Sequence, residues 1–129
     1  MPLITAGSPH SVRETIERLL SALEARGMEV FARIDHGAGA RTAGLELRDE
    51  EVVVFGNPRA GTPLMQADPK VGYELPLRLL VWDAGGRTTI GYRPPTELMD
   101  DYSVADRLDI LEGMTGLLEQ LVAEVIATS

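Results

Sequence analysis

The stretch that decides the fold is VVVFGNPRAGTP, residues 52–63, in which an apolar run ends at a glycine-bounded loop. The β-branched run from Val52 to Phe55 is short and apolar enough to form a central strand, and Gly56 ends it. The pair Thr62-Pro63 has the pattern of a helix start, in which a capping residue precedes proline. We therefore expect a strand, a loop and then a helix in this part of the chain.

The loop from Gly56 to Thr62 has the spacing Gly-x-x-x-x-Gly-Thr, which resembles the phosphate-binding loop of nucleotide hydrolases. That loop needs a Lys directly after its second glycine, where this chain has Thr62, and Pro58 removes a backbone N–H. A weaker prediction remains, that the loop and the helical turn after it hold a small anion on free backbone donors. The ligand-binding candidates in this loop are Asn57, Gly61 and Thr62 as donors and Arg59 as the countercharge.

The residues before this stretch predict a strand, a helix and a second strand. Residues 3–5 are short and apolar, as in a first strand. Residues 11–14, Ser-Val-Arg-Glu, form a capping box, after which apolar residues recur at helical spacing until Gly27. From Met28 to Asp35 the side chains alternate with period two, as in a strand covered on one side. Residues 37–45 are rich in Ala and Gly and predict a loop or a short helix.

The residues after this stretch predict short helical pieces, a hairpin and a long helix. Residues 64–73 read as two short helical pieces with a break at a proline. An apolar run, residues 75–82, and an alternating run, residues 87–92, flank the turn Asp-Ala-Gly-Gly and predict a β-hairpin. From about Val104 apolar residues recur at helical spacing, and their face is broad enough to lie across a whole sheet.

The order of these elements, β-α-β-β-β-β-α with small helical insertions, predicts one α+β domain over residues 1–129. We expect two layers and a largely antiparallel sheet. The second face of this sheet is expected to show a mixture of apolar and charged side chains: Phe31, Arg33, Arg78, Leu80, Trp82 and Thr89. Such a face is typical of an interface or a ligand-binding floor, and Trp and Arg concentrate binding energy at interface centres. We therefore expect a homodimer.

Motifs spread over most of the chain resemble one known family. They are VFARIDH (residues 30–36), AGL (43–45), VFGNP (54–58), GTPLM (61–65), LPL (75–77) and VW (81–82). Together they resemble the bacterial and archaeal family called domain of unknown function 302, over the region from Ser11 to about Tyr92. The resemblance implies a β-α-β(4)-α fold of the TATA-binding-protein-like kind and no established activity. The C-terminal helix matches only in type, and fold alone does not bring function with it.

Composition argues against several classes of function. The chain has no Cys, which excludes disulfides, thiolate nucleophiles, iron–sulfur clusters and Cys-ligated zinc. Its formal charge of −8, with twelve Lys and Arg scattered among twenty Asp and Glu, argues against nucleic acid as a partner. No apolar run approaches the roughly 20 residues of a membrane span, and the N-terminus lacks the pattern of a signal peptide. We expect a cytoplasmic protein with neither a membrane nor a nucleic-acid partner.

Asp35 and His36, at the end of a predicted strand, are the acid/base candidates, because an imidazole beside a carboxylate suits proton transfer. Adjacent strand residues point to opposite faces, so these two side chains need not cooperate, and alternatively both bond loop backbone. Asn57 has a structural alternative as well, because Asn before Pro forms turns. The chain has two His, His10 and His36, and they lack metal-ligand spacing, so we expect no metal site.

These observations leave two functions open. The first is a non-enzymatic binding or interaction module for a small polar or anionic ligand or a protein partner, near the loops that follow residues 28–35 and 52–55. The alternative is an enzyme of undefined reaction type in which His36 and Asp35 act as acid and base. The sequence points to no particular cofactor.

Overall fold

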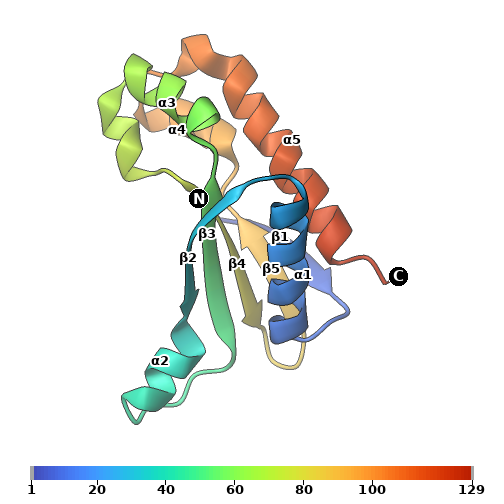
Figure 1. The fold of residues 1–129 in the computed structure, drawn as a ribbon. Coiled ribbons are helices and arrows are strands. Elements are labelled where there is room, and N and C mark those ends of the chain that lie inside the picture. The colour runs from blue at the N-terminus through green and yellow to red at the C-terminus, as the bar shows by residue number, and fades with distance from the viewer. Residues whose placement is uncertain (1, 129) are drawn as a thin grey trace.

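The protein is built on one five-stranded sheet, as the computed structural model shows for residues 2–128, the part of the chain that it describes. The strands are β1 (Ile4–Ser8), β2 (Glu29–Asp35), β3 (Glu50–Gly56), β4 (Leu77–Asp83) and β5 (Thr88–Tyr92). They lie in the order β1-β5-β4-β3-β2, and every neighbouring pair is antiparallel. This sheet and its helices form the predicted α+β fold (Figure 1).

Two long helices, α1 (Val12–Ala25) and α5 (Leu108–Val125), cover one face of the sheet. Helix α1 begins where the capping box predicts, because the N–H of Glu14 donates to the Ser11 hydroxyl at 3.0 Å. It ends before Gly27, whose φ of 66° is a left-handed conformation that glycine adopts without strain. The predicted boundaries of this helix are therefore confirmed at both ends.

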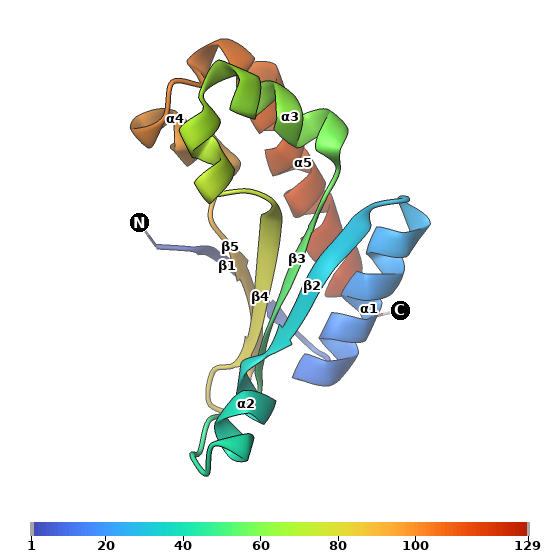
Figure 2. The same ribbon diagram turned by 60° about the vertical axis from the view of Figure 1, so that its left-hand side comes forward.

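The main hydrophobic core lies between these two helices and the sheet (Figure 2). Alternate residues of the central strands point into it and meet the apolar faces of both helices. Its fully buried side chains include Ile16, Leu19 and Leu23 from α1, Val53, Phe55, Leu79 and Val81 from the sheet, and Leu121 from α5. Each such side chain contributes about 1.5–3 kcal/mol relative to an exposed one. The opposite face of the sheet carries no helix in either view (Figures 1 and 2).

Short elements gather at one end of the sheet, and several of them form a second core with α5. They are α3 (Pro58–Ala67), η1 (Pro69–Tyr73), η2 (Pro95–Glu97), α4 (Leu98–Asp101) and η3 (Ala105–Arg107). Leu64, Val71 and Leu98 pack there against Leu111 and Met114 of α5. Helix α2 (His36–Thr42) lies at the opposite end of the sheet, as Figures 1 and 2 both show.

The start of α3 differs from the sequence prediction. The helix begins at Pro58, and Thr62 lies inside it and is not its cap. Asn57 is the N-cap, and its side-chain oxygen accepts the N–H of Arg59 at 2.9 Å. The Asn-Pro pair has the same cap-then-proline pattern as the later Thr-Pro pair and comes first in the chain, so the helix starts there.

Other element boundaries are close to those expected. For residues 37–45 the sequence predicts a loop or a short helix, and the structure has the short helix α2 there. Residues 64–73 form the end of α3 followed by η1. Strand β4 begins at Leu77, two residues later than predicted. Helix α5 begins at Leu108 and not near Val104, because the intervening residues form the 3₁₀ turn η3.

The uncovered sheet face differs from the predicted one at Phe31 and Arg33, because β2 contains a β-bulge that shifts the alternation of its side chains. Arg33 pairs with the core residue Val53 and therefore lies on the helix-covered side. Its Nε donates to Oε1 of the buried Glu51 at 2.8 Å, and this bond raises the pKa of Arg33. Phe31 lines a cavity at the end of the sheet. The residues that share the uncovered face include Ala32, Ile34, Glu50, Val52, Val54, Arg78, Leu80, Trp82 and Thr89.

Candidate functional site

The candidate residues of the sequence lie in two groups at opposite ends of β2 and β3. The strand register pairs Asp35 with Glu51 at one end and Glu29 with Gly56 at the other. At about 3.3 Å per residue, Glu51 and Gly56 are roughly 17 Å apart along β3. The first group is Asp35 and His36, beside α2, and the second is Asn57, Arg59, Gly61 and Thr62, in α3 and its cap. The structure therefore does not bring them into one site.

Asp35 and His36 do not form an acid/base pair in this arrangement. Oδ1 of Asp35 accepts the N–H of Ala38 at 2.8 Å, so this carboxylate is the N-cap of α2. The His36 side chain is exposed and borders a hollow on the uncovered sheet face. Within residues 2–128 its ring makes no hydrogen bond or ion pair. At this end of the sheet Asp35 is therefore a helix cap, and the exposed imidazole of His36 lacks a group that would orient it for catalysis.

The second group borders an open cavity of about 580 Å³ between α3, α5 and the adjoining ends of β2, β3 and β4. Most of its lining is apolar or glycine: Met28, Phe31, Gly56, Pro58, Ala60, Gly61, Met65, Leu75, Pro76, Leu77, Ile110, Gly113, Met114 and Leu117. The polar lining residues are Asn57, Arg59 and Thr62. A cavity of this size with a few polar groups is typical of a small-molecule site.

The backbone donors at the start of α3 are already used within the protein. Pro58 has no N–H, and the N–H of Arg59 donates to the Asn57 side chain. The N–H groups of Ala60 and Gly61 both donate to the Asn57 carbonyl, at 3.0 Å and 3.2 Å. The expected cradle of free backbone donors is therefore absent from this first turn, and Asn57 acts as the cap that its structural alternative predicts.

Arg59 dominates the electrostatics of this cavity. Among the described residues that line the cavity, Arg59 is the one with a charged side chain, and none is Asp or Glu. In the described part of the chain its guanidinium forms no ion pair, whereas Arg13, Arg26, Arg33, Arg41 and Arg93 each lie within 4 Å of a carboxylate. The rim of the cavity thus offers an available positive charge beside an apolar interior.

Sequence reasoning missed the wall that α5 and the methionines give to this cavity. Ile110, Met114 and Leu117 lie on the broad apolar face that the sequence predicts for the C-terminal helix, and the breadth of this face was the available signal. A helix that only covers a sheet needs a narrower stripe, so the surplus apolar positions indicated a second contact. Tertiary packing brings Met28 and Met65 to the same cavity, and no local pattern in the sequence predicts this.

Two polar clusters hold the short elements around the second core. Asp68 is buried, and its two carboxylate oxygens accept the N–H groups of Ser103, at 2.9 Å, and Lys70, at 3.1 Å. The bond from Ser103 is the main cause that lowers the pKa of Asp68. Arg93 bonds Glu74 at 3.0 Å, and the Tyr102 hydroxyl donates to the same carboxyl group, which raises the pKa of Tyr102. These contacts fix the frame of the cavity and do not point into it.

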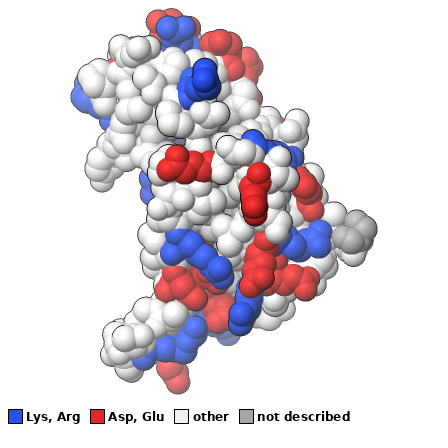
Figure 3. All heavy atoms as spheres, viewed as in Figure 1, with Lys and Arg blue, Asp and Glu red and all other residues white. Residues whose placement is uncertain are grey.

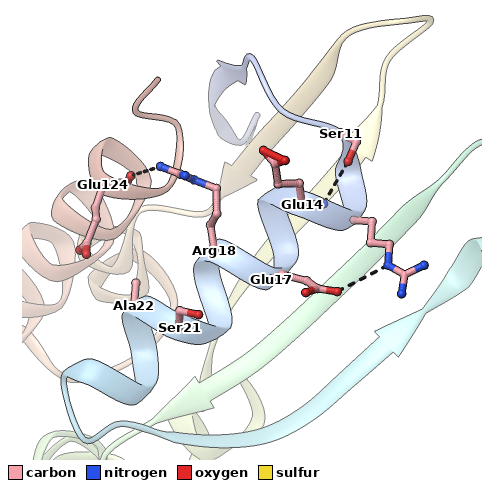
Figure 4. Close-up of a pocket in the computed structure, with 8 residues that line it drawn as sticks. Ser11, Glu14, Glu17, Arg18, Ser21, Ala22 and Glu124 are labelled. Atoms are coloured by element: carbon pink, nitrogen blue, oxygen red, sulfur yellow. Dashed lines mark hydrogen bonds and ion pairs between the residues drawn. The ribbon is translucent and has the colours of Figure 1, made fainter. Parts of the chain in front are cut away.

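The remaining large hollow lies along the polar side of α1 (Figure 4). Charged side chains of α1 and Glu124 of α5 line it, and their groups bond one another or nearby carbonyls. On the face shown in Figure 3, basic and acidic side chains are interleaved and no extended basic patch gathers. Within residues 2–128 no cluster of three metal-ligating side chains occurs, and no helix there is long and apolar enough to cross a membrane.

Comparison with known proteins places the chain in a family. Residues 4–126 match the family model described as "Domain of unknown function DUF302". The chain is 44% identical over 109 residues to proteins named "Fluoride-specific ion channel FluC 1" from Brucella suis biovar 1 (strain 1330) and Brucella abortus biovar 1 (strain 9-941). The aligned region covers 84% of this chain but only 43% and 40% of the length of those two relatives.

The fold is also similar to that of a solved structure, the uncharacterized conserved protein DUF302 from Bacillus stearothermophilus. The TM-score is 0.74 at 26% sequence identity, over 98% of this chain and 96% of that one. The family match covers nearly the whole sequence, and the structural likeness covers the same elements. This chain belongs to the DUF302 family, the domain of unknown function 302.

Proposed function

We propose that this protein is a non-enzymatic binding module whose ligand occupies the cavity between α3 and α5. The observation that carries the proposal is the cavity itself, about 580 Å³ of mostly apolar lining with Arg59, Asn57 and Thr62 as its polar groups. Burial of a ligand against such a lining supplies affinity, and a few polar groups supply orientation.

The competing proposal, an enzyme that uses His36 and Asp35, draws less support from the geometry. General acid–base catalysis needs a base, a group that orients it and a substrate within hydrogen-bond reach. Asp35 caps α2, and the exposed His36 has no such orienting contact among the described residues. The binding module is therefore the function that the arrangement favours.

Thermal unfolding with a library of metabolites and ions tests the binding module. A ligand at 100 times its dissociation constant should add about 2.7 kcal/mol to the free energy of unfolding. Gly113→Leu should abolish the stabilisation, because Gly113 lines the cavity and an added Cβ there meets no atom within 4 Å. Gly116→Leu is the matched control on the same helix, with equally open space at its Cβ. Compounds that stabilise the wild type and Gly113→Leu equally would place the ligand elsewhere.

A second copy of the chain is the proposed macromolecular partner, and the uncovered sheet face supports it. Strand register aligns Val52 with Leu80 at the centre of this face, Arg78 toward one end and Glu50 with Trp82 toward the other. A two-fold axis that lies in this face and crosses the strands at right angles would set Arg78 of each copy against Glu50 and Trp82 of the other copy. Such a face is self-complementary in charge and covers an apolar centre, as a two-fold dimer requires.

The likeness to proteins named fluoride-specific ion channels supports a second proposal, that this module is attached to or associated with such a channel. Fluoride therefore belongs in the thermal screen. Sodium fluoride should raise the melting temperature above that in sodium chloride of equal ionic strength if the module senses this anion. Equal melting temperatures in the two salts would count against a fluoride-binding role for the isolated chain.

A further inference from the structure

We infer that the ligand of the cavity is a flexible alkyl chain that ends in an anionic group, the chemistry of a medium-chain fatty carboxylate. This inference rests on the proposed function and names the class of ligand for the same site. It combines two observations, the adaptable apolar interior of the cavity and the single available positive charge at its rim.

The interior of the cavity suits an alkyl chain better than a rigid or polar ligand. Met28, Met65 and Met114 all line it, in a chain that has five Met in total. Unbranched methionine side chains adapt their shape to an irregular apolar partner, which a flexible chain also does. The remaining lining residues are apolar or glycine, and among residues 2–128 no buried side-chain N or O atom lacks a hydrogen-bond partner. No side chain of this wall therefore calls for a second polar group on the ligand.

The rim of the cavity selects a negative charge. Arg59 is exposed and makes no ion pair among residues 2–128, although the chain carries twenty acidic side chains. A guanidinium binds a carboxylate with two parallel N–H donors, so the head of the ligand is expected to lie at Arg59. Since the backbone donors of Arg59, Ala60 and Gly61 are already used, the side chain of Arg59 carries this recognition.

Titration calorimetry with hexanoate, octanoate, decanoate and neutral octanol tests both parts of the inference. Affinity should rise about fourfold per added methylene while the chain remains inside the cavity. Arg59→Gln should weaken octanoate binding about tenfold and leave octanol binding unchanged. Arg87→Gln is the control, because this exposed Arg lies at the β4–β5 turn and outside the cavity lining.

Gly113→Leu should weaken the binding of octanoate and of octanol alike, whereas Gly116→Leu should change neither, and thermal melts of both variants check that they fold.

Binding to anionic phospholipid vesicles distinguishes a bilayer lipid from a free carboxylate as the ligand. The net charge of −8 is expected to prevent the protein from binding such vesicles. Vesicle binding that Gly113→Leu abolishes would overturn the free carboxylate as the ligand. Affinity independent of chain length, or an Arg59→Gln variant that binds octanoate like wild type, overturns the inference. If another compound still binds in a way that depends on Gly113, the proposed function stands and only the ligand class is wrong.

Discussion

At the scale of single residues, Asn57 decides where α3 begins and therefore where Arg59 stands. Its side chain accepts one helical N–H and its carbonyl accepts two more, so one residue satisfies the first turn. Thr62, the expected cap, is exposed in the second turn of the helix. The position of Arg59 at the cavity rim follows from this choice of cap.

Asn57→Ala should consequently lower the free energy of unfolding by about 0.5–2 kcal/mol, the usual cost of a lost N-cap. Thr62→Ala should change it by less than about 0.5 kcal/mol, as surface substitutions do. Urea denaturation of the two variants beside wild type measures both values. A larger loss for Thr62→Ala than for Asn57→Ala would contradict the assignment of the cap.

Asp68 makes part of the stability depend on pH. Its pKa in the folded protein lies below the ordinary value of 3.8, so its contribution is fully present above that pH and is lost as pH falls through the lower folded value. The Asp68→Asn side chain has one acceptor oxygen in place of two, and its amide does not titrate. The difference in melting temperature between wild type and Asp68→Asn should therefore shrink below pH 3.8, and a constant difference from pH 6 to pH 3 would contradict this role.

At the scale of elements, α5 joins the sheet, the second core and the cavity. Leu118 and Leu121 pack in the main core, Leu111 and Met114 belong to the second, and Gly113 faces the cavity. One helix therefore couples the stability of the fold to the shape of the candidate site.

Leu118→Ala should lower the free energy of unfolding by about 2–5 kcal/mol, because the side chain is 1% exposed and its loss leaves a cavity in the core. Leu45→Ala is the matched control, since that Leu is 66% exposed and should change stability by less than about 0.5 kcal/mol. Chemical denaturation compares the two. A loss below about 1 kcal/mol for Leu118→Ala would show that α5 is peripheral to the fold.

The elements themselves were predictable because their signals are local. The capping box at Ser11, the alternation in β2 and the turn between β4 and β5 each lie within a few residues, and each predicted its element. The bulge at Phe31 was not predictable, since one extra residue in a strand leaves the apolar pattern almost unchanged. It moved Arg33 from the expected open face to the covered one, beside Glu51.

At the scale of the whole molecule, the two predicted site regions separate to opposite ends of the sheet, and an uncovered apolar face lies between them. Apart from the broad apolar face of α5, the cavity beside α3 was not predictable from the sequence, because its walls come from segments far apart in the chain. The open face was partly predicted, with Leu80, Trp82 and Arg78 on it as expected. The proposal of a dimer rests mainly on these three residues.

Trp82→Ala should weaken a dimer built on this face by about 2 kcal/mol or more, as the loss of a central aromatic side chain does. Sedimentation at micromolar concentration measures the effect. Leu108→Ala is the control, because Leu108 is 40% exposed and lies at the start of α5, away from this sheet face. A wild type that stays monomeric, or a Trp82→Ala variant that dimerises as tightly as wild type, would remove this interface.

NMR of protein labelled with ¹³C at the methionine methyl groups shows whether the cavity between α3 and α5 holds an amphipathic anion. Met28, Met65 and Met114 line the cavity, whereas Met99 packs beside the second core and serves as an internal control. On titration with octanoate, the methyl signals of Met28, Met65 and Met114 should shift together and saturate, while the signal of Met99 should stay in place. If octanoate at millimolar concentration leaves those three signals unchanged, or shifts the signal of Met99 alone, the cavity does not bind this anion.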